Sequence, residues 1–425
     1  LKKVCAQEAR SLYFGKHTSP SGHSTQHPAP CRRGSRNSWR SIYSMEHPVP
    51  TCSEEPAQPW PCRSPFEEIF TFPEMNLGAD SYNMVQQSFD YDPETGSLSV
   101  RGVDSCQFAA GFFKTPSLEE LRQRMDLDTA AEALGKRPLM VSQEVDDISG
   151  MHVRAENRYA VFQAASQFNT LEHTSQRGIP EHGITCYSGD RTQGPACATA
   201  CAPGTIVRNY FAFAPAGKGE TKAMGQTTEC QVTNLGEVEE ELDNAKERYF
   251  YIQNGYTLAN DADLRRLCEK LKGNEALCER IRCKLRIGVQ EDTEVVCSRF
   301  GSQLYKGNPG EQLVTQAYCS AVAVSYSRCS GHLWEPFARL ILESLYEATL
   351  YAAVENVQRH PNEPSARKVF LTAVGGGVFG NDMRWVKDAM YSAFRKFKDI
   401  GLEIVMVSYG GPTREFSELV ESFKP

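Results

Sequence analysis

The chain has 425 residues, of which 40% are hydrophobic and 23% are charged, and its 53 acidic and 46 basic side chains give a net charge of −7. This composition supports an ordinary packed core, and the length fits two or three structural units. An acidic chain is unlike a general nucleic-acid-binding protein, whose affinity rests on clustered Lys and Arg, so we expect no nucleic-acid partner.

The charge is unevenly distributed along the chain. Residues 1–45 contain eight Lys and Arg side chains and one acid, so this segment carries +7 and the remainder −14. Residues 1–65 are rich in Ser, Pro, His and Arg, and we predict that they are disordered, because they can bury too little surface to offset the entropy of ordering. Two alternatives remain open for the basic segment: an organelle transit peptide, or sequence translated ahead of the first methionine, Met45. We otherwise expect a cytoplasmic protein.

The 15 cysteines indicate neither a disulfide scaffold nor a zinc site. The pairs Cys197/Cys201 and Cys278/Cys283 lack Cys-x-x-Cys spacing, and no pair of histidines lies nearby. We therefore interpret the cysteines as small buried thiols and expect no metal and no cofactor. No uncharged apolar run reaches the roughly 18 residues that a membrane helix needs, so we expect a soluble protein.

The segment 66–150 alternates short extended stretches with turns, and we predict an N-terminal α+β extension that packs on the main domain. Asp92–Gly96 has the composition of a hairpin turn, flanked by extended stretches at 85–91 and 97–103. Ser117 is followed by acids, which is typical of a helix N-cap and its first turn.

The middle of the chain combines a buried strand with a long polar loop. Residues 159–165 form an apolar run typical of a buried strand, the loop spans 166–191, and a helix with small side chains follows at 195–202. Residues 215–283 are charged and helical in pattern, and we predict a helical insertion there, after which strand character resumes at 285–296.

The C-terminal third has the clearest periodicity. We predict strands at 313–325, 368–374 and 402–409, with helices at 334–357 and 382–398 between them. Alternation of strand and helix is typical of a parallel sheet covered by helices, so the predicted fold class is α/β.

A glycine-rich loop, Gly375–Asn381, joins the second of these strands to the following helix. Glycines let the backbone approach phosphate oxygens, and a helix N-terminus presents unpaired N–H groups, so the loop predicts an anion site. A tight turn without a ligand is the simpler alternative. The loop also matches the Rossmann pattern Gly-x-Gly-x-x-Gly, but the acid expected at the end of the next strand is replaced by Ser408 and Tyr409.

The polar loop contains the first candidate for a catalytic carboxylate. Asp190 lies where a helix N-terminus would keep it ionised, as a base or a cation-stabilising carboxylate needs, although a plain capping Asp takes the same position. Asp292 and Glu294 are lesser candidates, which a solvated strand face explains more simply.

A thiol hydrolase is a further hypothesis. Cys197 lies near a predicted helix N-terminus, with His182 as a candidate base and Gln193 as a candidate oxyanion donor. The Ala-Cys-Ala sequence around this cysteine is also typical of close helix packing.

Together these loops resemble a known family. Ala-Ala-x-x-x-Asn at 164–169 and Gly-Gly-Gly-Val-Phe-Gly-Asn at 375–381 look like the two loops that hold ADP-ribose in macrodomains. Three further motifs resemble the divergent macrodomain family of ADP-ribosylhydrolases typified by the Legionella effector MavL and its eukaryotic relatives. They are Gln-Phe-Asn-x-Leu-Glu at 167–172, Gly-Ile-Thr-x-Tyr-x-x-Asp-x-Thr-Gln-Gly-Pro-Ala-Cys at 183–197, and Arg-Asn-Tyr-Phe at 208–211.

The resemblance implies a fold, an activity and a partner. The fold would be a macrodomain-like three-layer α/β/α domain with a mixed central sheet at 151–425, with the N-terminal extension and the helical insertion added to it. The activity would be hydrolysis of the N-glycosidic bond between ADP-ribose and arginine side chains of proteins, with ubiquitin among the candidate acceptors. Such hydrolysis passes through an oxocarbenium-like transition state that an ionised carboxylate stabilises.

By motif match, the resemblance implies that Asp190 is catalytic, and we expect Glu181 and Glu172 to assist it. This chain has His182 where the family carries a further loop acid, so Glu181 is the expected substitute. The alternative is a reader that binds ADP-ribose without cleaving it. The residues implied to bind the substrate lie in the two loops and at the helix entry between them. They are Gln163, Ala164, Ala165, Asn169, Ile184, Thr192, Gln193, Gly194, Gly375, Gly376, Gly377, Val378, Phe379, Gly380 and Asn381.

Overall fold

The computed structural model describes residues 63–75, 78–214 and 223–424. The basic N-terminal segment, residues 1–45, and its possible targeting role therefore lie outside the described residues. Of the predicted disordered stretch, residues 1–65, only the last three residues are described. There Ser64 accepts a hydrogen bond from the backbone N–H of Glu67 and caps helix α1 (Pro65–Phe70). Residues 64 and 65 thus begin a helix, and all elements described below belong to the compact unit 59–425.

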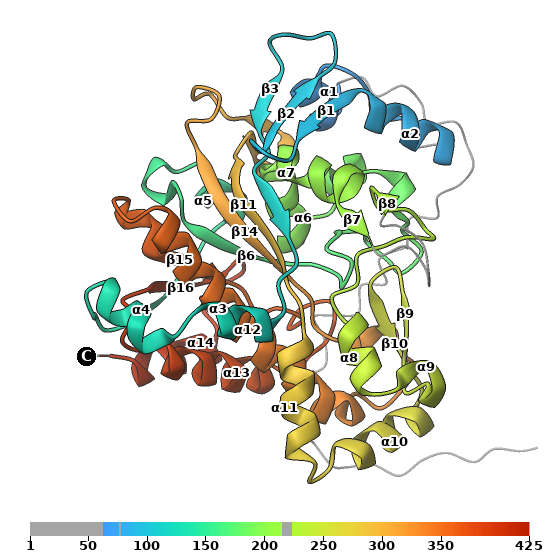
Figure 1. Ribbon diagram of the computed structural model, residues 1–425, viewed down its shortest axis with the longest axis vertical. Helices are drawn as coiled ribbons and strands as arrows, with labels where there is room; N and C mark the ends of the chain where they lie inside the picture. Colours follow the sequence, from blue (N-terminus) through green and yellow to red (C-terminus); the bar gives the residue numbers. More distant parts are fainter. Residues whose placement is uncertain (1–62, 76–77, 215–222, 425) are drawn as a thin grey trace, which may run out of the picture. The chain divides into compact units, whose positions relative to one another are not determined.

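A mixed seven-stranded sheet forms the centre of this unit (Figure 1). Five neighbouring strands run parallel, and the two at one edge pair antiparallel. In spatial order the strands are β4 (Phe112–Lys114), β11 (Gly288–Glu294), β14 (Leu313–Cys319), β6 (Val161–Ala165), β15 (Lys368–Leu371), β16 (Glu403–Ser408) and β5 (Met140–Val145).

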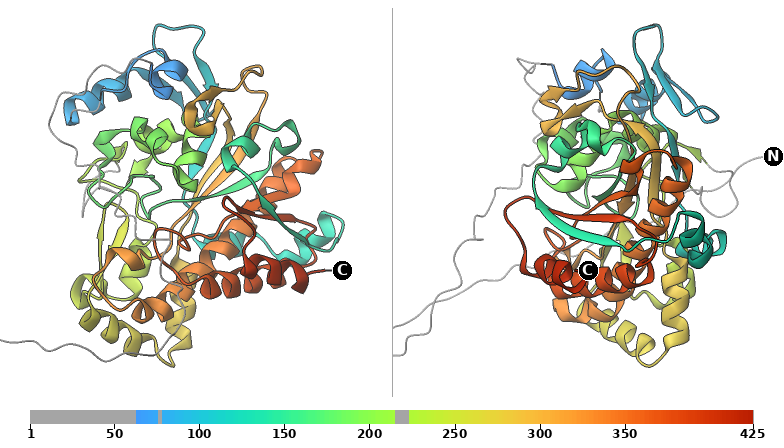
Figure 2. Two further views of the ribbon diagram at one scale, coloured as in Figure 1. Left: turned by 180° about the vertical axis from the view of Figure 1, so that it is seen from behind. Right: turned by 90° about the vertical axis from the view of Figure 1, so that its left-hand side faces the viewer.

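Helices cover both faces of the sheet, and strand side chains alternate between two cores, as the pleat requires. On one face Val161, Val369 and Ile404 pack with α12 (Glu335–Arg359), α13 (Met383–Lys396) and α14 (Arg414–Ser422). On the other face Phe162 and Phe370 pack with α5 (Ile148–His152) and α6 (Gln193–Ala200), and α7 (Ala202–Ile206) lies beside α6 against β11. Figure 2 shows these helices from two further sides. The predicted three-layer α/β/α fold with a mixed sheet is confirmed.

Helix α12 is buried on more sides than its apolar pattern predicts. Phe337, Leu340, Ile341 and Leu345 are buried as expected. The opposite side of the helix is covered as well, because α12 contacts the sheet and also helices α3 (Leu118–Arg124), α10 (Asp261–Leu271) and α11 (Glu275–Lys284).

The N-terminal segment contributes to the central sheet. Helix α2 (Ala79–Gln87) precedes a small sheet of β1 (Phe89–Asp92), β2 (Ser97–Val100) and β3 (Gln107–Ala109), in which the predicted hairpin is present. Ser117 caps α3 in a capping box with Glu120, as its sequence predicts, and α4 (Leu127–Ala133) follows. Strands β4 and β5 form the two edges of the central sheet, and both come from residues 66–150. The predicted domain boundary at residue 150 stays a prediction.

The described part of the helical insertion alternates short helices with hairpins. It comprises β8 (Ala223–Met224), which pairs with β7 (Phe213–Ala214), then α8 (Gly236–Glu241), α9 (Asn244–Glu247), β9 (Tyr251–Gln253), β10 (Tyr256–Leu258), α10 and α11. The helical pattern at 238–250 is broken because Asp243 and Arg248 adopt left-handed backbone angles, with φ of 52° and 55°.

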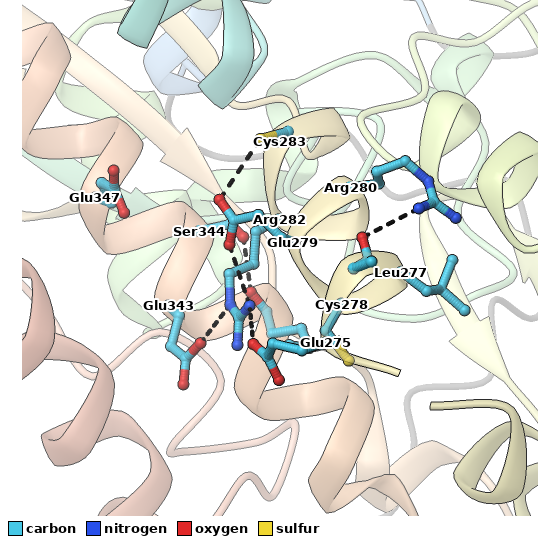
Figure 3. Close-up of polar contacts among 12 residues, drawn as sticks. Glu275, Leu277, Cys278, Glu279, Arg280, Arg282, Cys283, Glu343, Ser344 and Glu347 are labelled. Atoms are coloured by element: carbon cyan, nitrogen blue, oxygen red, sulfur yellow. Dashed lines mark hydrogen bonds and ion pairs between the residues drawn. The ribbon is translucent and has the colours of Figure 1, made fainter. Parts of the chain in front are cut away.

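Ion pairs attach the insertion to the core. Figure 3 shows Arg282 of α11 with its three acidic partners. Arg282 pairs with Glu343 of α12 at 2.7 Å, and within α11 it pairs with Glu275 and Glu279 at 3.0 and 3.2 Å. Arg122 of α3 joins the same network through Glu279 and Glu347, at 2.6 and 2.7 Å. These contacts hold α11 against α12.

The expectations about disulfides and membrane helices are compared with the described residues. The eleven cysteines that the structure describes are all free thiols. Among the described residues, no helix combines the length and the apolar character required to cross a membrane.

Candidate functional site

A cavity of about 450 Å³ opens where the parallel strands end. Its wall is built by the segments that follow β14, β6, β15, β16 and β5, together with the N-terminus of α6 and Tyr256 of β10. Ligands of open α/β sheets bind at this edge, because the loops after parallel strands converge there. The cavity is therefore the candidate functional site.

The glycine loop forms one wall of the cavity. Gly375 to Phe379 line it directly. Gly380 and Asn381 lie behind, and the Asn381 side chain donates to the carbonyl oxygens of Val322 and Gly375, at 2.8 and 3.3 Å. Gly375 has a φ of 75°, and a Cβ on it would lie 2.4 Å from the Cβ of Ala321. The loop is thus fixed against the segment after β14.

Two helices begin at the cavity wall, because Met383 of α13 lines it as well as the start of α6, so the predicted supply of N–H groups by the helix after the glycine loop stays a prediction. The N-terminus of α13 is capped by Asp382, which accepts from the backbone N–H of Arg384 at 2.8 Å. Hydrogen bonding to Arg384 also lowers the pKa of Asp382 to about 2. At α6, Thr192, Gln193 and Gly194 line the cavity, and no side chain caps the helix.

Gly375→Ala tests this loop geometry. The new Cβ would strain a left-handed backbone and displace Ala321, so we expect the free energy of unfolding to fall by about 1–3 kcal/mol. Gly377→Ala is the matched control, because a Cβ there would meet nothing within 4 Å, and we expect a change within about 0.5 kcal/mol. Urea denaturation measures both variants, and equal stability of the two would contradict the fixed loop.

Aromatic side chains and a carboxylate form one end of the cavity. The rings of Tyr256, Tyr326 and Phe379 lie 4.9 to 5.5 Å apart, centroid to centroid. Burial raises the pKa of both tyrosines, and the negative charge of Asp190 adds to this increase. Asp190 is half-buried and accepts from the backbone N–H of Thr192 at 2.8 Å. This hydrogen bond precedes α6, which begins after Thr192, so Asp190 has a place at the cavity but does not cap the helix.

Glu172 lines the same cavity but is completely buried. Its carboxylate lies 3.2 Å from Arg208 and accepts from the hydroxyl of Ser166 at 2.9 Å. Burial raises the pKa of Glu172 to about 7, although Arg208 and Ser166 favour the ionised form. Arg208 is held by the carbonyl oxygen of Thr170 and by the ring of Tyr318, whose centroid lies 3.5 Å from the guanidinium carbon.

The raised pKa of Glu172 predicts a pH dependence of stability. The folded chain keeps the proton up to pH 7, whereas the unfolded chain releases it near pH 4.5, so the contribution of Glu172 to the unfolding free energy falls as the pH rises between these values. Comparing the wild type with Glu172→Gln by urea denaturation at several pH values isolates this contribution. An identical pH dependence of the two proteins would contradict the raised pKa.

Several other predicted residues lie outside the cavity wall. Glu181 does not line the cavity and accepts from the backbone N–H and the hydroxyl of Thr228, at 2.7 and 2.9 Å, so its catalytic role stays a prediction. Four more support the wall from behind. Gln163 donates to Thr349, and Ala164 packs in the core. Asn169 donates to Gln231, and the backbone N–H of Ile184 donates to Glu74. Of the predicted binding residues, Ala165 lines the cavity along with Thr192, Gln193, Gly194 and Gly375 to Phe379.

The thiol hypothesis is wrong. Cys197 is completely buried behind the cavity wall, and burial raises the pKa of its thiol far above the ordinary value. Gln193 is occupied as well, because its side chain joins the backbone of Ala165 and Gln163 at 2.8 and 2.7 Å. His182 is exposed. The packing interpretation of this segment stands.

The lesser candidates also lie elsewhere. Asp292 pairs with His360 at 2.7 Å and does not line the cavity. Glu294 is buried rather than on a solvated face, and it accepts from the backbone N–H groups of Ala109 and Gly310, both at 2.9 Å. Within the described ranges, no group of three or more His, Cys, Asp and Glu side chains is arranged to hold a metal ion.

Sequence reasoning missed other lining residues. His173 is buried beside Glu172, and burial lowers its pKa to about 3, so it is neutral. Asp146 and Asp147 follow β5 directly, and their place after a predicted extended stretch was an available signal. Phe300 gave no signal, because its position depends on an unusual turn described below.

Comparison with known proteins gives weak structural similarities. No protein-family model and no curated protein matches the chain. The poly(ADP-ribose) glycohydrolase of Thermomonospora curvata is 11% identical, covers 80% of this chain and 96% of its own, and has a TM-score of 0.37. The poly(ADP-ribose) glycohydrolase of Deinococcus radiodurans in complex with ADP-ribose is 13% identical, covers 73% and 95%, and also has a TM-score of 0.37. Likeness at this level establishes neither fold nor activity.

Proposed function

We propose that this protein is an ADP-ribosylhydrolase, which binds ADP-ribose attached to a protein and hydrolyses the bond at the distal ribose. The observation that carries the proposal is one cavity that joins carboxylates and aromatic rings at one end to a glycine loop and an uncapped helix N-terminus. The sequence resemblance to the divergent macrodomain family supports the same function.

The glycine loop and the start of α6 suit a diphosphate. Gly375 to Phe379 line the cavity, and so do Thr192, Gln193 and Gly194 at the start of α6. Backbone N–H groups and the positive end of a helix dipole bind phosphate oxygens without a basic surface, which agrees with the acidic composition of the chain. Diphosphate binding would orient the distal ribose toward Asp190.

Asp190 is the proposed general base, and Glu172 is proposed as a second carboxyl group that assists proton transfer. As the bond between the ribose C1 atom and the leaving group breaks, the electron pair leaves with that group, and the carboxylate of Asp190 stabilises the oxocarbenium character at C1. Asp190 accepts a proton from water, whose oxygen bonds to C1, and the proton then passes to the leaving group. A carboxyl with a pKa of about 7, such as Glu172, can give or take protons near neutral pH.

We further propose that the leaving group is the guanidine of an arginine side chain. The sequence resemblance supports this bond type, and it keeps ubiquitin among the candidate acceptors. The cavity wall also supports it, because the carboxylate of Asp190 at the wall can attract a cationic guanidinium. Water supplies the hydroxyl to ribose and a proton to the guanidine, so the products are ADP-ribose and an unmodified, protonated arginine.

Release of ADP-ribose from modified proteins tests the function. Purified protein is incubated with arginine-linked, serine-linked and glutamate-linked ADP-ribosylated substrates, and mass spectrometry measures free ADP-ribose. We expect release from the arginine-linked substrate to be the fastest. Release only from an oxygen-linked substrate would contradict the bond type, and no release from any of them would contradict the hydrolase.

A reader that binds ADP-ribose without turnover is the second candidate. The observation that favours it is that Glu172 is fully enclosed by Arg208 and Ser166 and that Glu181 does not line the cavity. Calorimetry that detects tight ADP-ribose binding, combined with no release in the assay above, would select this alternative.

A further inference from the structure

The cavity wall carries several acids and a single cationic side chain. Asp146, Asp147, Glu172 and Asp190 line it, and of the described residues that do so only Arg191 is positively charged, since the buried His173 is neutral. An anionic ligand in this cavity would therefore meet one cation among four carboxyl groups.

The acids of the wall already have partners. Asp146 forms an ion pair with Arg154, and Glu172 with Arg208. Asp147 accepts from the backbone N–H and the hydroxyl of Ser149, at 3.1 and 2.8 Å. Asp190 accepts from Thr192, as described above. Each carboxyl group is thus engaged by a group other than Arg191.

Arg191 is held by an aromatic ring instead of an acid. Its guanidinium carbon lies 5.0 Å from the centroid of the Phe300 ring, and in the described part of the chain the guanidinium forms no ion pair. A cation–π contact orients the guanidinium but uses none of its five N–H donors. Arg191 therefore presents an oriented set of donors at the cavity wall.

The turn that holds Phe300 is strained. Arg299, Phe300 and Gly301 all have left-handed backbone angles, with φ of 49°, 56° and 82°. Two consecutive residues with a Cβ in this region cost free energy, and such strain concentrates at functional sites. The turn lies between β12 (Cys297–Ser298) and β13 (Gln303–Leu304), and the backbone N–H of Arg299 donates to Ser149 of α5 at 2.9 Å. The strain thus places an aromatic ring beneath Arg191.

Asp190 and Arg191 serve different parts of the cavity. Asp190 lies close enough to Tyr256 and Tyr326 for its charge to affect them, whereas Arg191 lies on Phe300. The negative charge therefore belongs to the end proposed for the distal ribose. The positive charge is directed to another part of the wall, which includes the start of α6.

We propose that Arg191, seated on Phe300, binds the diphosphate of the nucleoside diphosphate sugar and makes the cavity selective for that anion. This inference rests on the proposed function, because ADP-ribose is the diphosphate in question. A planar guanidinium with free donors forms paired, charge-assisted hydrogen bonds to phosphate oxygens, which backbone N–H groups alone do not provide.

Calorimetric titration of full-length Arg191→Ala with ADP-ribose, ADP and adenosine tests the inference at low and moderate salt. We expect the affinity for ADP-ribose and ADP to fall about tenfold to a hundredfold, and the salt dependence of the remaining binding to be weaker. Adenosine binding should not change, because adenosine has no phosphate. Arg191→Lys should keep part of the affinity, and Phe300→Leu should lose part of it.

Arg177→Ala is the matched control, because Arg177 is an exposed arginine of the same loop that does not line the cavity, and its binding should equal that of the wild type. Unchanged ADP-ribose affinity in Arg191→Ala would overturn the inference alone. Equal losses for ADP-ribose and adenosine would also overturn it, because they would show damage to the whole cavity. Wild-type protein that binds no ADP-ribose would overturn the proposed function as well.

Discussion

Asp190→Asn is expected to slow the release of ADP-ribose from an arginine-linked substrate by about 10²- to 10⁴-fold, while ADP-ribose binding stays close to that of the wild type. The amide keeps the size of the side chain, and its oxygen can still accept from the backbone N–H of Thr192. It cannot take a proton from water or carry the negative charge that stabilises an oxocarbenium ion. Single-turnover release and calorimetry measure the two effects separately.

Glu181→Gln is the control for this prediction. Glu181 is a carboxylate of the same loop, but it bonds to Thr228 and does not line the cavity, so this variant should release ADP-ribose at nearly the wild-type rate. Full activity of Asp190→Asn would remove Asp190 from the mechanism. Loss of activity in Glu181→Gln with normal stability would support the role expected for Glu181 as the substitute for the family's further loop acid.

Arg208→Met is expected to lower the free energy of unfolding by about 3–5 kcal/mol at pH 8. Arg208 and Glu172 are both fully buried, so removal of the cation leaves an unpaired carboxyl group that is shielded from solvent. The loss should shrink toward pH 5, because the orphaned Glu172 can then take up a proton. Urea denaturation at the two pH values measures the difference.

A surface pair provides the comparison. Arg414 and Glu418 form an exposed ion pair at 2.8 Å, and Arg414→Met should cost less than about 1 kcal/mol. The double variant Glu172→Gln/Arg208→Met should lose less stability than the two single losses added together, because no charge is left unpaired. A loss from Arg208→Met as small as that from Arg414→Met would show that the buried pair does not hold the loop.

Local patterns predicted many individual elements of the fold. Ser117 with Glu120 marked the start of α3, and the apolar periodicity marked α12, α13, β15 and β16. The order of the strands did not follow, because β4 and β5 reach opposite edges of the sheet through pairings that are distant in sequence. Hydrophobic periodicity specifies which face of an element is buried, but not which element covers it.

The site was predictable to a different degree at each residue. Asp190 and the glycine loop followed from residue type and position, and both line the cavity. Glu181 was misplaced because its partner Thr228 lies 47 residues further along the chain, in the predicted insertion. The start of α6 was not singled out as an anion site, although Thr192, Gln193 and Gly194 were expected to bind substrate, and all three line the cavity.

A crystal structure of Asp190→Asn with bound ADP-ribose tests the central claim most directly. We predict that the diphosphate lies on Gly375–Phe379 and the start of α6. The distal ribose should lie between Tyr256 and Tyr326, with its C1 atom within one water molecule of residue 190. ADP-ribose bound outside this cavity, or with its distal ribose turned away from residue 190, would contradict the account.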